Sequence, residues 1–180
     1  MARDHSTGFL YVVDQNNDRV MAYRYENITG DVAAGGNGNG TNPNQLNNPT
    51  GLHYDVLTNG FYIANTASNN IVRWTIGETR WNLVLGDVNG SAGDLPSLLR
   101  RPMDVTMDPM GNIYVADRGN HRIQFFAVGQ SVGSTIAGIS SMKGNASNTL
   151  SSPSSIALDS QLNLYVADFG NNRIQLFLRY

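Results

Sequence analysis

The sequence of 180 residues contains no cysteine and almost no lysine. Without cysteine there is no disulfide framework, no thiolate metal site and no cysteine nucleophile. Lys143 is the only lysine among twelve basic residues, and the arginines are spread along a chain whose formal net charge is -2. Nucleic-acid binding depends on many Lys and Arg contacts to phosphate, so bulk charge gives it little support.

Long hydrophobic runs are also missing. No stretch approaches the roughly 18 apolar residues that a membrane span needs. The opening MARDHSTGFLYVVD lacks the apolar core and small-residue cleavage site of a secretory signal. We therefore expect neither a transmembrane segment nor a signal peptide. N-x-S/T sequons, which would suit a secreted glycoprotein, occur at Asn27, Asn39, Asn89 and Asn145. So asparagine-rich a chain contains several of them by chance, and the cellular compartment therefore stays open.

One nine-residue segment is present four times. The copies read YVVDQNNDR, YIANTASNN, YVADRGNHR and YVADFGNNR, and they begin at Tyr11, Tyr62, Tyr114 and Tyr165. Successive copies are therefore 51, 52 and 51 residues apart. Two further markers keep nearly the same spacing, a Leu-x-x-Pro motif that starts at Leu46, Leu99 and Leu150 and a strand-ending glycine at Gly35, Gly86 and Gly138. The chain is a repeat array.

Each period holds four short apolar runs, clearest in the third copy as MDVTM, NIYVA, RIQFFAV and STIAG. Four strands per repeat is the content of a β-propeller blade. The runs are nearly continuous in hydrophobicity, as expected for sheets covered on both faces by neighbouring sheets. The sequence predicts an all-β propeller of four-stranded antiparallel blades.

An acidic and a basic residue recur five positions apart around the turn between the second and third strands. In three copies the pair is Asp-Arg, and in the second copy both residues change together to asparagine. If the pair is buried, losing one partner would cost about 3–5 kcal/mol, whereas replacing both leaves a neutral pair. We predict structural pairs at Asp14 and Arg19, Asn65 and Asn70, Asp117 and Arg122, and Asp168 and Arg173.

These motifs resemble the NHL repeat. The likeness rests on Pro-x-(small)-apolar, then YVAD, then GNNRI before an apolar strand, and it runs from about residue 8 to the C terminus. No Trp-Asp pair of the WD40 kind occurs. The resemblance implies about 3.5 to 4 blades, with approximate bounds 8–46 (first strand missing), 47–99, 100–150 and 151–180 (last strand missing).

Familiar NHL domains close with about six blades, so the resemblance also implies an incomplete ring. Open ends expose unpaired backbone and an uncovered blade face, which proteins normally cover. Two explanations stay open. A second copy of the chain completes the ring as a homodimer, or the sequence is a fragment of a larger protein.

The predicted binding surface is the face where the loops between strands two and three meet the loops that join blades. Its residues differ between copies while the flanking scaffold repeats, which is typical of a binding face, although solvated loops vary for many other reasons. The candidate residues are Thr66, Arg118, His121 and Phe169 from the first set of loops and Arg100 and Arg101 from the second.

Catalytic patterns are sparse. Similar propellers include metal-dependent lactonases and an amidating lyase, which hold metal in the central channel through residues of several blades. Here the equivalent innermost positions are His53, Thr106 and Ala157, so one of three carries a ligand type, and Asp104 lies beside them. We interpret His53 as a packed histidine and predict no catalytic residue, no metal ligand and no cofactor.

The sequence therefore favours a non-catalytic scaffold that presents its loop face to a protein or peptide partner. Two alternatives remain. NHL domains of some relatives bind RNA, which would set Arg100, Arg101 and Arg118 against phosphate and Phe169 against a base. The other is a fragment of a metal-dependent hydrolase or lyase.

Overall fold

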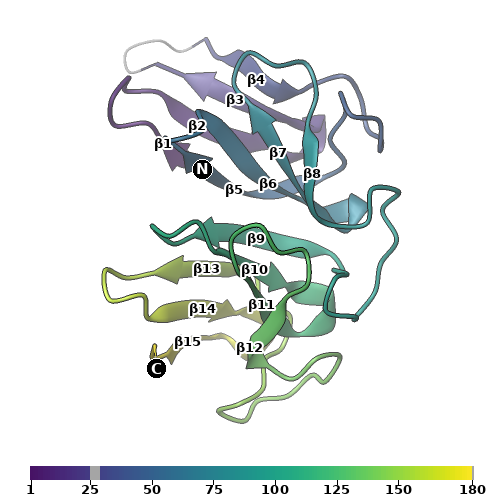
Figure 1. Cartoon of the computed structure of the whole chain (residues 1–180), viewed down its shortest axis with the longest axis vertical. Coiled ribbons are helices and arrows are strands. Elements are labelled where there is room, and N and C mark those ends of the chain that lie inside the picture. Colours follow the sequence, from purple (N-terminus) through teal and green to yellow (C-terminus); the bar gives the residue numbers. More distant parts are fainter. Residues whose placement is uncertain (25–28, 180) are drawn as a thin grey trace.

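The computed structural model describes residues 1–24 and 29–179, so the sequon at Asn27 lies outside the described residues. Its strands form four separate antiparallel sheets, one for each sequence repeat (Figure 1). The predicted all-β propeller architecture is confirmed. Among the described residues no helix is long and apolar enough to cross a membrane.

The sheets follow one another along the chain as blades 1 to 4, and in each blade the strands lie side by side in sequence order. Blade 1 consists of β1 (Ala2–Arg3), β2 (Leu10–Asp14), β3 (Arg19–Tyr23) and β4 (Asp31–Gly35). Blade 2 consists of β5 (Pro49–Asp55), β6 (Gly60–Asn65), β7 (Asn70–Thr75) and β8 (Asn82–Gly86). Blade 3 consists of β9 (Pro102–Met107), β10 (Ile113–Asp117), β11 (Arg122–Phe126) and β12 (Ser134–Gly138). Blade 4 consists of β13 (Ser155–Leu158), β14 (Leu164–Asp168) and β15 (Arg173–Phe177).

The expectation that blade 1 lacks its first strand is wrong. Ala2 and Arg3 pair with Tyr11 and Leu10 as strand β1. Asp4 then closes the turn to β2 by accepting hydrogen bonds from the Ser6 amide at 2.8 Å and the Ser6 hydroxyl at 2.7 Å. A strand of two residues contains too few apolar side chains to stand out as a hydrophobic run, so the sequence pattern did not reveal it.

The recurring glycine at the end of the outer strand has a steric reason. Gly35 and Gly138 have positive φ values of 71° and 79°, which disfavour other residues. A Cβ at either position would also collide with the main-chain oxygen of Asp18 or His121 on the neighbouring turn. The glycine therefore lets the outer strand leave the sheet close to the turn between the second and third strands.

The hydrophobic cores lie between successive blades. Phe61, Ile63 and Trp74 of blade 2 pack against Tyr11 and Val20 of blade 1. Corresponding clusters fill the space between blades 2 and 3 and between blades 3 and 4. Because the two inner blades are covered by a neighbour on each face, their strand sequences are apolar on both faces.

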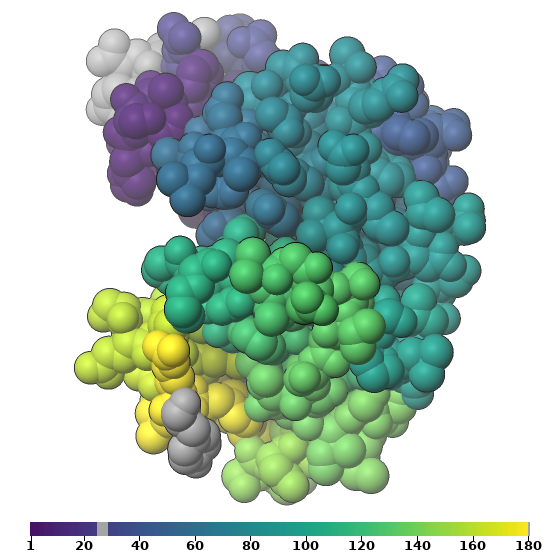
Figure 2. Space-filling model, in the orientation of Figure 1, coloured from purple at the N-terminus to yellow at the C-terminus, as the bar shows by residue number. Residues whose placement is uncertain are grey.

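The four blades curve into an open arc, with the first blade (purple) and the last blade (yellow) at its two ends (Figure 2). The end faces are uncovered. Ile174 and Leu176 of β15 are 68% and 46% exposed, and Leu10 of β2 is 38% exposed. In the inner blades, residues at the same repeat positions as Ile174 and Leu10 are buried.

Candidate functional site

The two predicted sets of loops do meet on one face of the arc. Between the second and third strand of each blade lies a short 3-10 turn, η1 (Gln15–Asn17), η2 (Thr66–Ser68), η3 (Arg118–Asn120) and η4 (Phe169–Asn171). The Gly119 amide of η3 donates to the Arg100 carbonyl at 2.8 Å, and the Gly170 amide of η4 donates to the Ser151 carbonyl at 2.7 Å. The turns η3 and η4 are therefore each fixed to the loop that precedes their own blade.

The Asp-Arg pairs are ion pairs at the base of these turns. Arg122 Nε lies 2.8 Å from Asp117 Oδ2, and both side chains are almost fully buried, with exposures of 3% and 0%. In blade 4, Arg173 Nε lies 2.9 Å from Asp168 Oδ2. Each carboxylate also accepts a loop amide, from Arg100 N at 2.7 Å for Asp117 and from Ser151 N at 2.6 Å for Asp168.

In blades 3 and 4 the arginine of the pair reaches further, into the preceding inter-blade loop. Arg122 donates from its two Nη atoms to the main-chain oxygens of Asp94 at 2.9 Å, Leu95 at 3.2 Å and Leu98 at 3.0 Å. The pair thus holds together a turn, a strand end and a loop. We refer to this arrangement of Asp, Arg and loop main chain as the latch.

The asparagine pair of blade 2 is arranged differently from the expectation. Asn65 and Asn70 face each other across β6 and β7 and are both buried. They do not hydrogen-bond each other. Asn65 Oδ1 accepts the Asn47 amide at 2.6 Å, and Asn70 Nδ2 donates to the Asp87 carbonyl at 3.0 Å.

Three of the candidate binding residues present their side chains on the loop face. Phe169 at the tip of η4 is 63% exposed. Arg118, from the neighbouring blade, places its Cζ 5.4 Å from the centre of the Phe169 ring, within the range of a cation–π contact. Arg101 is exposed on the adjacent loop. We call Arg101, Arg118 and Phe169 the loop-face patch.

The other three candidates have structural contacts. Thr66 is only 5% exposed, and its hydroxyl donates to the Pro102 carbonyl at 2.6 Å, so the expectation that it faces a ligand is wrong. His121 is half-buried and its Nδ1 accepts the Ser152 amide at 3.0 Å. Burial, with Lys143 nearby, lowers the pKa of His121, which fits this acceptor role. Arg100 is exposed but contributes its main chain to η3 and Asp117.

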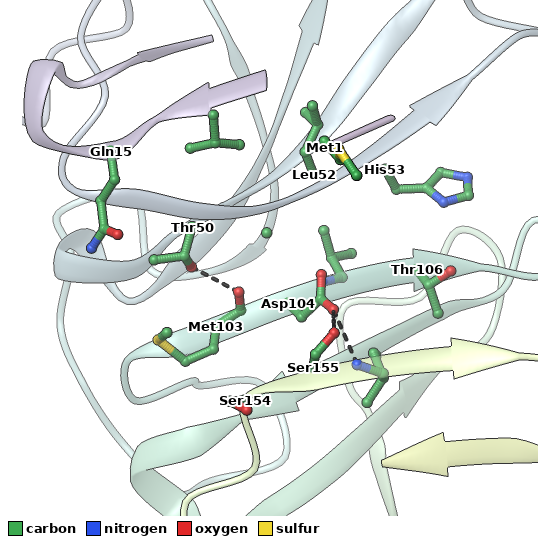
Figure 3. Close-up of a pocket in the computed structure, with 14 residues that line it drawn as sticks. Met1, Gln15, Thr50, Leu52, His53, Met103, Asp104, Thr106, Ser154 and Ser155 are labelled. Carbon is green, nitrogen blue, oxygen red and sulfur yellow. Dashed lines mark hydrogen bonds between the residues drawn. The ribbon is translucent and has the colours of Figure 1, made fainter. Parts of the chain in front are cut away.

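The innermost strands line a cavity of about 480 Å³ (Figure 3). His53 of β5 and Thr106 of β9 are among the residues that line it, and they occupy equivalent positions of their strands. Asp104 is the carboxylate in this wall, and burial raises its pKa while hydrogen bonds lower it. Its oxygens accept from the Ser155 hydroxyl at 2.7 Å, the Ile156 amide at 3.0 Å and the Val105 amide at 2.9 Å. Asp104 therefore joins blade 3 to blade 4.

This cavity does not fit a metal centre. Within residues 1–24 and 29–179, no group of three or more His, Asp or Glu side chains is placed to hold an ion. Both oxygens of Asp104 already accept hydrogen bonds, and His53 is the only other side chain of a ligand type among the residues that line this cavity. A metal would have to displace the contacts that connect the blades.

We expect that excess Ca²⁺ or Zn²⁺ will change the melting temperature by less than about 1 °C, since an ion that does not bind the native state cannot stabilise it. Differential scanning fluorimetry with and without each ion measures this. A clear rise that disappears in an Asp104→Ala variant would contradict the expectation and support the metal-dependent alternative.

Sequence reasoning missed the asparagines that complete the latch. Asn120 and Asn171 each donate from Nδ2 at 2.7 Å to the carboxylate of the pair, and Asn17 donates to Asp14 at 2.9 Å. They occupy the same place in the three copies that carry Asp-Arg, and the second copy has Ser68 there. In the sequence, these asparagines could have been recognised because they occur in the same copies as the Asp-Arg pair and are absent from the copy that lacks it.

Repeated four-stranded blades packed face to face around a polar cavity define this chain as an open β-propeller segment. Two of its four repeats match a known repeat family. The family model for the NHL repeat matches residues 99–126 and 150–177, which are the third and fourth copies.

Comparisons with known proteins agree with this fold. NHL repeat-containing protein 3 of Mus musculus is 34% identical over 95 residues, which are 51% of this chain and 26% of that relative. A gluconolactonase of Xanthomonas campestris aligns with a TM-score of 0.71 at 19% identity, covering 97% of this chain and 56% of that one. A chain from a nidogen/laminin complex aligns with a TM-score of 0.69 at 18% identity, with the same coverage of 97% and 56%.

The matched segment is about a quarter of the curated relative, and the chain spans just over half of these two solved structures. At below 25% identity the structural neighbours show the fold alone. One of them is an enzyme, and another comes from a protein complex.

Proposed function

We propose that this chain is a non-catalytic binding module that holds a protein or peptide partner on its loop-face patch. The observation that carries the proposal is Phe169, an aromatic side chain that is 63% exposed although the turn beneath it is fixed by the Asp168 latch. Exposed aromatic and arginine side chains on a rigid support are the residues that most often dominate binding energy at protein interfaces. The neighbour from a nidogen/laminin complex lends the proposal further support.

The chemistry of the patch indicates the kind of partner. Arg118 covers part of the Phe169 ring, and Arg101 lies exposed on the adjacent loop. Asp117 and Asp168, which directly precede Arg118 and Phe169 in the chain, are fully buried and already accept several hydrogen bonds. The accessible charge is therefore positive, and we expect a peptide that carries an acidic residue next to an apolar one.

The test uses peptides selected from a displayed library on the wild-type chain and then synthesised. We expect a variant with Arg101→Ala, Arg118→Ala and Phe169→Ala to bind them at least about tenfold more weakly by calorimetry, because hot-spot residues contribute about 2 kcal/mol or more. Leu57→Ser is the control, since Leu57 is 93% exposed in the hairpin at the other end of blade 2. Equal binding by wild type and the triple variant would refute the proposal.

RNA is the second candidate, favoured only by the contact between Arg118 and Phe169. A base stacks on an exposed aromatic ring, and arginines bind the phosphates around it. Fluorescence anisotropy with a short single-stranded oligouridine distinguishes the two. RNA binding that weakens with salt and is lost in the triple variant would replace the peptide by RNA as the ligand.

A further inference from the structure

One side-chain contact recurs at each of the three junctions between successive blades. The residue that follows the 3-10 turn of one blade accepts a main-chain amide from the loop that leads into the next blade. The three contacts are Asp18 Oδ1 with the Asn48 amide at 2.7 Å, Asn69 Oδ1 with the Arg101 amide at 2.9 Å and His121 Nδ1 with the Ser152 amide at 3.0 Å. Acceptor and donor residues all have φ values between 48° and 56°, so the backbone geometry is the same at the three junctions.

The junctions differ in the chemistry of the acceptor. An amide oxygen such as that of Asn69 accepts a hydrogen bond irrespective of pH. An imidazole nitrogen accepts only while the ring is neutral, and both ring nitrogens become donors once the ring is protonated. Because His121 Nδ1 accepts the Ser152 amide, the single proton of the neutral ring lies on Nε2. The junction between blades 3 and 4 therefore depends on a group that titrates near neutral pH.

This contact lies directly beneath the loop-face patch. Ser152 follows Ser151, whose amide and carbonyl fix the turn η4 that carries Phe169. His121 follows the turn η3, which carries Arg118. The hydrogen bond between His121 and Ser152 thus connects the two turns that hold the arginine and the aromatic ring of the patch.

We propose that His121 makes the junction between blades 3 and 4 sensitive to pH. Uptake of a proton from solvent at Nδ1 turns the acceptor into a donor that faces the Ser152 amide, and the hydrogen bond between them is lost. The loop that leads into blade 4 then separates from η3, and the patch loses the fixed distance between Arg118 and Phe169. This last step rests on the proposed function, since it implies release of the bound peptide in mild acid.

The surroundings of His121 determine the pH range of this response. Burial and the charge of Lys143 lower the pKa of His121, whereas the carboxylates of Asp117 and Asp168 raise it, and the net effect is a pKa below the ordinary value of 6.5. As the pH falls, the unfolded chain therefore takes up the proton before the folded chain does. The stability that the neutral ring provides is present above about pH 6.5 and is lost below it.

The repeat supplies a matched variant, because His121→Asn places the residue of blade 2 at this junction. From about pH 7.5 to about pH 5.5, we expect the melting temperature of the wild type to fall by at least about 3 °C more than that of His121→Asn, since an amide that loses its acceptor destabilises the fold. Burial also lowers the pKa of His53, but His53 is the same in both proteins and its effect cancels. Equal falls in the two proteins would overturn the proposal. The reverse substitution, Asn69→His, should add a similar pH dependence to the junction between blades 2 and 3.

A titration of the wild-type chain by NMR tests the junction without any variant. The amide signal of Ser152 should shift with the same midpoint as the ring of His121. The amide of Arg101, whose acceptor is Asn69, is the internal control and should not follow that midpoint. A Ser152 signal that stays constant while His121 takes up its proton would contradict the proposal.

Calorimetry with the selected peptides at the two pH values tests the step that involves the patch. The wild type should bind them at least about threefold more weakly at the lower pH, whereas His121→Asn should bind them about equally at both. Binding that changes equally in the two proteins would overturn this step. If no peptide binds at either pH, the proposed function is refuted, and the Ser152 signal and the melting temperatures still decide whether the junction responds to pH.

Discussion

Replacing Arg122 by alanine is expected to lower the free energy of unfolding by about 3–5 kcal/mol, because it leaves the buried Asp117 carboxylate without its partner. Asp117 is 0% exposed, and burial raises its pKa against the hydrogen bonds that favour the charged form. The variant also loses the three donations from Arg122 to the loop oxygens. Urea unfolding followed by the fluorescence of Trp74 and Trp81 measures the change.

Two variants separate loss of the ion pair from loss of side-chain volume. Arg19→Ala removes the same side chain from the blade 1 pair, in which the side chains of Arg19 and Asp14 are 34% and 29% exposed, and should cost only about 0–1 kcal/mol. Asp117→Asn with Arg122→Asn copies the neutral arrangement of blade 2 and should cost less than Arg122→Ala, since no charge is left buried. If the double variant were as unstable as Arg122→Ala, the stranded charge would not be the cause.

Much of the fold could be predicted from the sequence because the same physical constraints recur in every blade. The Asp-Arg pairs, the strand-ending glycine and the Leu-x-x-Pro motif each have a fixed role, and those roles repeat with the period of the chain. Strand β1 was missed because its two residues are held by pairing with β2 and by the Asp4 turn rather than by a hydrophobic pattern of their own. Local pattern and long-range pairing are separate sources of strand formation.

The candidate site was harder to predict because variation between copies has two different causes. Phe169 varies and is exposed, as expected for a ligand-facing residue. Thr66 occupies the same position in blade 2 but is buried, since its hydroxyl contacts both Thr50 and the Pro102 carbonyl of the next blade. A residue that differs between copies can thus contact either a ligand or a neighbouring blade, and sequence spacing alone does not separate the two.

Replacing Ile123 by alanine is expected to destabilise the chain by about 2–5 kcal/mol, the usual cost of truncating a large side chain in a packed core. Ile123 is 0% exposed and lies between blades 3 and 4, in a cluster with Leu150, Ile156 and Val166. Blade 4 covers it completely. Its loss should weaken the contact between the two blades, and denaturant unfolding measures the change.

Ile174→Ala provides a matched control, because Ile174 occupies the same repeat position in β15 and faces an alanine across the strand pair in the same register. Ile174 is 68% exposed, so its truncation should change stability by no more than about 0.5 kcal/mol. The two substitutions remove the same atoms, but Ile123 also pairs with Ala137 of the outer strand β12, whereas β15 is the edge strand of its sheet. A large loss on Ile174→Ala would show that this face is covered in solution, for example by a second copy of the chain. A small loss beside a large one for Ile123 would show that burial by the neighbouring blade and the outer strand, which Ile174 lacks, determines how much each isoleucine contributes to stability.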